Sequence, residues 1–116
     1  MICCFCIILE LGDAGVAAIV EGLGENKKLK SLKLLRNKIT DEGAAVLIKA
    51  LMENTTLTTL NLTQNMLTDK SIDAFLNLFK VNPTIKTVYF NQNSIKTMNV
   101  KAKIKEMQKL GINVSI

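Results

Sequence analysis

The chain contains no histidine and no tryptophan, and it has only one proline among its 116 residues. Without histidine it cannot use an imidazole as a general base, build a Ser-His-Asp or Cys-His pair, or form a zinc site with a histidine ligand. The only adjacent acidic pair, Asp41 and Glu42, is better explained by helix capping than by acid–base catalysis. We therefore expect no enzymatic activity, no cofactor and no metal site.

The cysteines are few and crowded together, at positions 3, 4 and 6. Such crowding is a poor disulfide framework and favours a reducing compartment. The longest apolar run, Met1 to Leu9, is less than half of the ~20 residues that span a bilayer, and it lacks the basic start of a secretion signal. The sequence therefore predicts a soluble cytoplasmic protein.

The charge is unevenly distributed along the chain. Fifteen Lys and Arg residues stand against ten Asp and Glu residues, and residues 59–116 hold eight of the basic and three of the acidic ones. A basic surface attracts nucleic acid, anionic lipid and acidic protein alike. Because base-stacking platforms need exposed rings, a chain with four phenylalanines and one tyrosine is not expected to bind nucleic acid.

A period of 28 residues runs through most of the chain. The columns that repeat are 29/57/85, 32/60/88, 34/62/90 and 39/67/95, all apolar, the asparagines 37/65/93 and 26/54/82, and the aspartates 13/41/69. Within a unit, residues 32–34 alternate apolar and polar side chains, which predicts a strand with one buried face. Residues 44, 47, 48 and 51 are apolar at helical spacing, which predicts an amphipathic helix. A strand and a helix of this size cannot bury their apolar faces alone, so the units are expected to stack.

Each predicted helix begins near an aspartate. Asp13, Asp41 and Asp69 occupy the same position in successive units. A carboxylate there can accept the free N–H groups of the first helical turn and interact with the positive end of the helix dipole. We therefore expect each aspartate to cap its own helix.

This pattern resembles the leucine-rich repeat, in particular the 28-residue ribonuclease-inhibitor-like subfamily. The positions that carry the resemblance are Leu29, Leu32, Leu34, Asn37, Ile39, Gly43, Leu47 and Leu51. The resemblance implies an α/β solenoid, a horseshoe fragment with a parallel sheet on the concave face and helices on the convex face. It implies one domain, 1–116, of about four units: 1–28, 29–56, 57–84 and 85–116. It also implies that Asn37, Asn65 and Asn93 are structural and bond to backbone in the turn after each strand.

The first unit departs from the pattern. A step of 28 back from Leu32 and Leu34 reaches Cys4 and Cys6, which predicts a first strand with cysteines in the core, and Leu9 replaces the expected asparagine. The alternatives are acylation of the cysteines or a disordered end. An unpaired first strand could self-associate, and membrane attachment is expected only if Cys3, Cys4 or Cys6 is acylated.

The last unit departs in another way. Lys103 occupies the column of Ile19, Leu47 and Phe75, so the helix is expected to turn and leave Lys101, Lys103, Lys105 and Lys109 in water as a polar cap. Residues 112, 114 and 116 are apolar and alternate with polar ones, which predicts a short closing strand.

Strand residues between the buried leucines should point to the concave face, where we expect a partner to bind. The candidates are Ser31, Lys33, Leu35, Arg36, Thr59, Asn61, Thr63, Tyr89 and Asn91. Tyrosine and arginine most often anchor interfaces, so Tyr89 and Arg36 are the first choices.

Three functions fit these observations. The first is a non-catalytic protein-binding module, because relatives such as ribonuclease inhibitor, the repeats of NOD-like receptors and the actin-binding end of tropomodulin bind proteins. The second is a GTPase activator resembling the Ran-activating proteins, which share this repeat type but have an acidic C-terminal part. The third is an adaptor for anionic surfaces or membranes through the lysines of residues 101–109.

Overall fold

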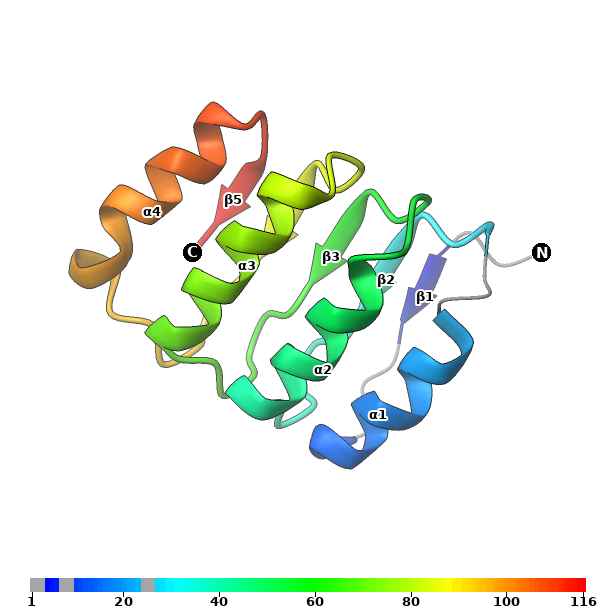
Figure 1. The fold of residues 1–116 in the computed structure, drawn as a ribbon. Helices are drawn as coiled ribbons and strands as arrows, with labels where there is room; N and C mark the ends of the chain where they lie inside the picture. The colour runs from blue at the N-terminus through cyan, green and yellow to red at the C-terminus, as the bar shows by residue number, and fades with distance from the viewer. Residues whose placement is uncertain (1–3, 7–9, 24–26) are drawn as a thin grey trace.

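Strands and helices alternate throughout the computed structural model, which describes residues 4–6, 10–23 and 27–116. The elements are β1 (Cys4–Cys6), α1 (Gly12–Leu23), β2 (Ser31–Lys33), α2 (Asp41–Leu51), β3 (Thr59–Asn61), α3 (Asp69–Val81), β4 (Thr87–Tyr89), α4 (Thr97–Lys109) and β5 (Asn113–Ser115). The five strands form one parallel sheet in sequence order. The helices lie side by side in a single layer over one face of this sheet (Figure 1). The predicted α/β solenoid is confirmed.

The core lies between the sheet and the helices and follows the repeat columns. The residues of the three-unit columns that are buried are Leu29, Leu57, Ile85, Leu32, Leu60, Val88, Leu34, Leu62, Phe90, Ile39 and Leu67. The helices contribute Ala44, Leu47, Ile48 and Leu51 from α2, as the helical spacing predicts. In α3 the ring of Phe75 lies 5.1 Å from that of Phe90 and 6.0 Å from that of Phe79, centroid to centroid. Aromatic contacts of this kind stabilise the interior beyond the burial of their area.

The strand register keeps the 28-residue step only in the middle of the sheet. Ser31, Thr59 and Thr87 lie side by side, whereas β1 and β5 are displaced. In β1 it is Phe5 that pairs with Leu32, while Cys4 and Cys6 pair with Ser31 and Lys33. The predicted first strand is present, but the expectation that its cysteines take the core columns is wrong.

The displacement has a local cause. The N–H of Leu11 donates to Asn37 Oδ1 just as the N–H of Ile39 donates to Asn65 Oδ1, so Leu11 keeps its place in the repeat. The segment between β1 and Leu11 is therefore one residue shorter than in later units. Cys3, a candidate for acylation, and Leu9, which replaces the repeat asparagine, lie outside the described residues. The side chains of Cys4 and Cys6 are also outside the description.

Threonines, and not aspartates, cap the middle helices. The Thr40 hydroxyl accepts the N–H of Glu42 at 3.3 Å, and the Thr68 hydroxyl accepts the N–H of Lys70 at 3.4 Å. The expectation that Asp41 caps its own helix is therefore wrong. Its carboxylate is directed into the following unit instead, as described below.

The last helix keeps a narrow buried stripe of Val100, Ile104 and Met107. Lys103 is half-buried and forms an ion pair with Asp73 of α3, so it is not the free, water-facing cap residue that we expected. The carboxylate of Asp73 offsets the cost of placing the Lys103 ammonium at a position that is apolar in the other units. The closing strand β5 pairs in parallel with β4, as the alternation of residues 112–116 predicts.

Candidate functional site

The face of the sheet opposite the helices carries the candidate binding residues in rows. Because the strands are parallel and in register, Lys33, Asn61, Tyr89 and Ser115 lie side by side. Ser31, Thr59, Thr87 and Asn113 form a second row. The two rows make a continuous polar strip across four strands, with one cation and one aromatic ring.

Exposure separates the candidates into two groups. The half-buried group comprises Ser31, Lys33, Leu35, Thr59, Asn61, Thr63, Thr87, Tyr89 and Asn91, whereas Arg36 is exposed. Asn61 and Thr63 partly satisfy each other, because Asn61 Oδ1 accepts the Thr63 N–H at 3.0 Å and the Thr63 hydroxyl at 2.6 Å. Exposure thus sets apart Arg36 alone, and among the half-buried residues Lys33 carries the charge and Tyr89 the aromatic ring of the strip.

A rim of left-handed residues follows the strands. Arg36, Gln64 and Gln92 have φ values of +58°, +57° and +58°, in three successive units. The N–H of Arg36 donates to Thr63 O at 3.1 Å, and that of Gln64 donates to Asn91 O at 2.9 Å. This conformation costs a residue with a side chain about 1–2 kcal/mol. The side chains of all three are exposed at the ends of the strands, beside the polar strip.

Asparagine side chains hold each turn to the previous unit. Asn65 Oδ1 accepts the N–H groups of Asn37 and Ile39 at 3.0 and 3.1 Å, and its Nδ2 donates to Leu34 O and Leu62 O at 2.9 and 3.0 Å. Asn93 repeats the pattern, because its Oδ1 accepts the N–H of Leu67 and its Nδ2 donates to Leu62 O, both at 2.9 Å. Asn37 Oδ1 accepts the N–H of Leu11. All these bonds go to backbone, so these side chains position the rim and are not free to bind a ligand.

A second asparagine ladder lies at the opposite edge, where helices lead back to strands. Asn82 is buried and its Nδ2 donates to Leu51 O and Asn54 O, both at 2.7 Å. Asn54 is also buried, and its Nδ2 donates to Leu23 O at 3.3 Å. The repeat column 26/54/82 marks these residues in the sequence, but the pattern alone gives them no role.

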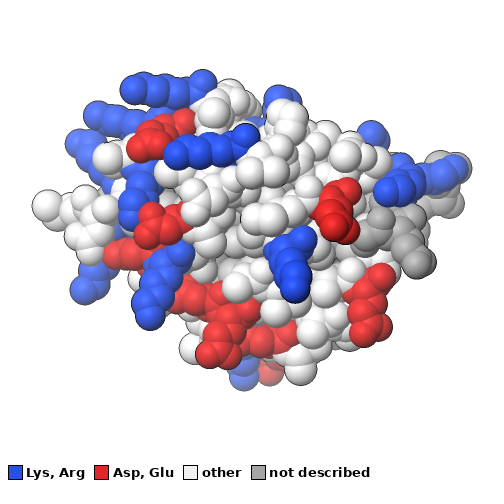
Figure 2. Space-filling model, viewed as in Figure 1, with Lys and Arg blue, Asp and Glu red and all other residues white. Residues whose placement is uncertain are grey.

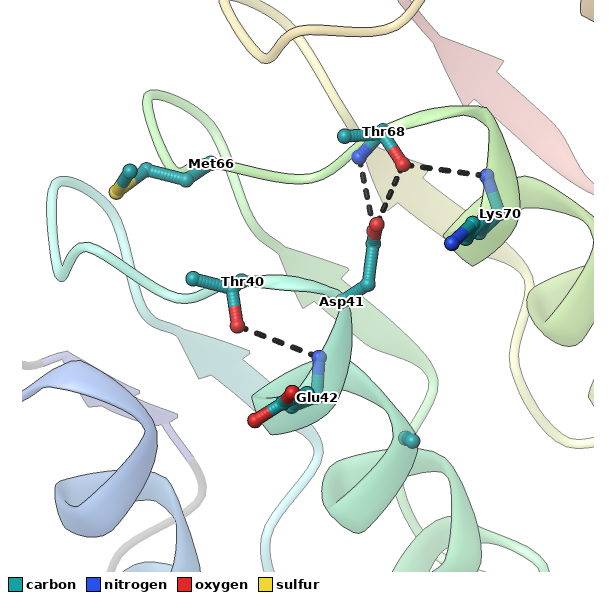
Figure 3. Close-up of a pocket in the computed structure, with 7 residues that line it drawn as sticks. Thr40, Asp41, Glu42, Met66, Thr68 and Lys70 are labelled. Atoms are coloured by element: carbon teal, nitrogen blue, oxygen red, sulfur yellow. Dashed lines mark hydrogen bonds between the residues drawn. The ribbon is translucent and has the colours of Figure 1, made fainter.

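Aspartates form a third ladder, at the N-terminal ends of the helices. Asp41 accepts the N–H of Thr68 at 2.8 Å and the Thr68 hydroxyl (Figure 3). It also accepts the hydroxyl of Ser71. Asp13 accepts the N–H of Thr40 at 2.9 Å and also its hydroxyl. Asp69 accepts the N–H of Lys96 at 2.7 Å and Asn99 Nδ2 at 2.9 Å. Each aspartate therefore links its unit to the next one.

These bonds change the acidity of two carboxyl groups. Burial by itself would raise the pKa of Asp41, but the hydroxyls of Ser71 and Thr68 and the Thr68 N–H lower it below its ordinary value of 3.8. The side-chain amide of Asn99, followed by the Lys96 N–H, lowers the pKa of Asp69 in the same way. A carboxylate that is held ionised in this way is a poor general acid.

A shallow cavity of about 450 Å³ opens beside the aspartate ladder. Its lining residues are Thr40, Asp41, Glu42, Ala45, Met66, Thr68 and Lys70. The Asp41 carboxylate points toward Thr68, the Thr40 hydroxyl points toward the Glu42 backbone, and Met66 lies at the edge (Figure 3). The hydroxyls of Thr40 and Thr68 and the carboxylate of Asp41 are thus engaged in bonds that link or cap the helix ends.

Two kinds of feature are not found in the described part of the chain. No three residues of the histidine, cysteine, aspartate and glutamate types are grouped closely enough there to hold a metal ion. Over the same residues, none of the helices has the length and apolar character needed to cross a bilayer.

The comparisons with known proteins agree with this fold. A family model described as Leucine Rich repeat matches residues 25–47 and 53–76. No curated protein matches the chain. Among solved structures, that of leiomodin-1 actin-binding site 2 superposes with a TM-score of 0.72 at 23% identity, covering 89% of this chain and 62% of that one.

Two further structures share the fold. The tropomodulin C-terminal domain of Caenorhabditis elegans gives a TM-score of 0.74 at 18% identity, covering 90% of this chain and 65% of that one. The Chaetomium Mex67:Mtr2 structure gives a TM-score of 0.63 at 16% identity, covering 90% of this chain and 69% of that one. The chain thus spans 62% and 65% of the lengths of the leiomodin and tropomodulin structures. Two matched repeats and a solenoid shared over nine tenths of the chain show that this chain has the leucine-rich repeat fold.

Proposed function

We propose that this chain is a non-catalytic protein-binding module that contacts its partner through the polar strip and the adjoining rim. The observation that carries the proposal is the position of Lys33 and Tyr89 on the sheet face opposite the helices, with Arg36 on the adjoining rim (Figure 1). The three ladders fix this face through bonds between neighbouring units. A pre-ordered face loses little conformational entropy when it binds a partner.

The size of the strip limits how it binds. Four strands at ~4.8 Å are about 14 Å wide, and two alternating residues span ~7 Å along a strand, so the strip has roughly 100 Å² of plan area. A standard interface buries about 800 Å² on each partner. The partner must therefore also contact the rim residues Arg36, Gln64 and Gln92, which are exposed beside the strip.

We treat residues 1–116 as one repeat domain and assign its units to the ribonuclease-inhibitor-like subfamily, because the central strands keep a 28-residue step. One of the structures with the same fold is named as an actin-binding site. Actin is therefore the first partner to test, since a shared fold suggests a partner to try but does not establish one.

The test is affinity capture with three forms of the chain, from lysate and from purified actin. The wild type is compared with the double variant Tyr89→Ala/Arg36→Ala on the strip and rim. The control is Lys49→Ala/Glu53→Ala on the exposed side of the α2 region, which leaves the net charge unchanged. A protein that is retained by the control and lost by the strip variant supports the proposal. Partners retained equally by both variants, or no partner at all, would contradict it.

A further inference from the structure

The two sides of helix α4 differ in charge compensation. The side facing α3 carries Lys103, paired with Asp73, and Glu106, paired with Lys80 at 3.5 Å. Asn99, on the same side, donates to Asp69 at 2.9 Å. Lys103, Glu106 and Asn99 on this side of α4 thus each have a polar or charged partner on α3.

The opposite side of α4 carries lysines at helical spacing. Lys101, Lys105 and Lys109 are exposed and lie four residues apart, so they form one stripe along the helix. Met98 continues this stripe toward the start of the helix and is 93% exposed. We call these four residues the lysine stripe.

Within residues 59–116, no acidic side chain is left to balance the lysine stripe. Residues 59–116 contain only three acidic residues, Asp69, Asp73 and Glu106, and all three are engaged on the α3 side of α4. Lysine side chains accordingly gather over α4, at the left of the helix face (Figure 2). The positive excess of the whole chain is therefore concentrated at this end of the solenoid.

The arrangement makes the isolated helix less stable. Like charges four residues apart destabilise a helix by about 0.2–0.5 kcal/mol per pair, and the stripe has two such pairs. Lys96, the N-cap residue of α4, makes no side-chain capping bond, and the first turn of α4 contains no acidic residue. Carboxylates placed along the stripe would remove the repulsion.

The chemistry of the stripe favours one class of anionic partner. The apolar residues Val100, Ile104 and Met107 of α4 are buried against the solenoid and cannot enter a bilayer, which leaves Met98 as the only large apolar side chain on the stripe. The stripe also has no aromatic ring on which a nucleic-acid base could stack. We propose that the lysine stripe binds an acidic helical segment of a protein, with carboxylates repeated every four residues.

The proposal can be tested with a defined probe. The probe is a synthetic 16-residue alanine-rich peptide with glutamate at every fourth position, titrated into the ¹⁵N-labelled chain at low salt. We expect amide shifts centred on residues 98–109. The triple variant Lys101→Gln/Lys105→Gln/Lys109→Gln should weaken binding at least tenfold, because three charge contacts are lost.

Two control variants make the result decisive. Lys30→Gln/Lys49→Gln/Lys86→Gln removes the same charge from exposed lysines elsewhere and should change the affinity less than threefold. Tyr89→Ala/Arg36→Ala should bind the peptide like the wild type, which separates this stripe from the polar strip. Equal losses in both lysine triples, shifts centred outside α4, no binding, or binding to phosphatidylserine vesicles without binding to the peptide would each overturn the proposal.

Discussion

The carboxylate of Asp41 accepts the backbone N–H of Thr68 at 2.8 Å across 27 residues of chain. It also accepts the hydroxyls of Thr68 and Ser71, so one side chain joins the start of α2 to the start of α3. Thr68 in turn caps α3 through the N–H of Lys70. Asp41 thus stabilises the following helix by holding its cap in place.

Replacing Asp41 by alanine should lower the free energy of unfolding by about 1–3 kcal/mol, because the partly buried donors of Thr68 and Ser71 lose their acceptor. The matched control is Asp73→Ala, which removes an exposed partner of Lys103 and should cost about 0–1 kcal/mol. Urea denaturation followed by circular dichroism measures both values. Equal losses in the two variants would contradict the role of Asp41.

Stability should depend on acid pH. The pKa values of Asp41 and Asp69 are lowered in the folded state, so their contribution is complete above the ordinary value of 3.8 and is lost as pH falls toward the lowered values. We expect the free energy of unfolding to decrease as pH is lowered from about 5 to 2. In Asp41→Asn the decrease should be smaller over the same range, and an unchanged slope would refute the assignment.

Asn65→Ala should be more destabilising than most single surface changes. It removes the acceptor of two backbone N–H groups and the donor to Leu34 O and Leu62 O. Leaving these groups unpaired should cost about 2–4 kcal/mol. Asn77 is exposed on α3 and serves as the control, with an expected change within about 0.5 kcal/mol for Asn77→Ala. Thermal unfolding of the two variants compares them directly.

Two glycines in helices should respond to alanine with opposite signs. A Cβ at Gly43 would clash with Asp13 Oδ1 and lie 3.0 Å from Ile39 Cγ2, so Gly43→Ala should destabilise the chain. A Cβ at Gly22 would have nothing within 4 Å, so Gly22→Ala should stabilise it by about 0.5–1 kcal/mol through helix propensity. The difference in melting temperature between the variants tests both expectations, and a stabilised Gly43→Ala would show that Asp13 moves freely.

The sequence predicts the fold because the repeat columns report burial directly. Leu32, Leu60 and Val88 are apolar at a fixed step, and their burial follows from stacking alone. Contacts between units are less visible, since any side chain near a helix start can bond within its own unit or across to another. This is why Asp41 was expected to cap its own helix, although its partner lies in the next unit.

The ends of the chain are also hard to predict. One residue fewer before Leu11 changes the register of β1, and a strict 28-residue step therefore gives Cys4 where the sheet pairs Phe5 with Leu32. The half-burial of Lys103 depends on Asp73, which no periodic pattern links to it. The binding role of the polar strip remains a prediction, because the sequence gives its position but not its partner.

The direction of the ladders has a consequence for engineering. Asn65 reaches back to the unit before it, and Asp41 reaches forward to the unit after it. The internal units 29–56 and 57–84 therefore carry matching asparagines, aspartates and capping threonines where they meet their neighbours, although Gly43 stands in the first where Ser71 donates to Asp41 in the second. A duplicate of residues 29–56 inserted after residue 56 would meet complementary groups on both sides, so the array should tolerate lengthening at its centre better than at its ends.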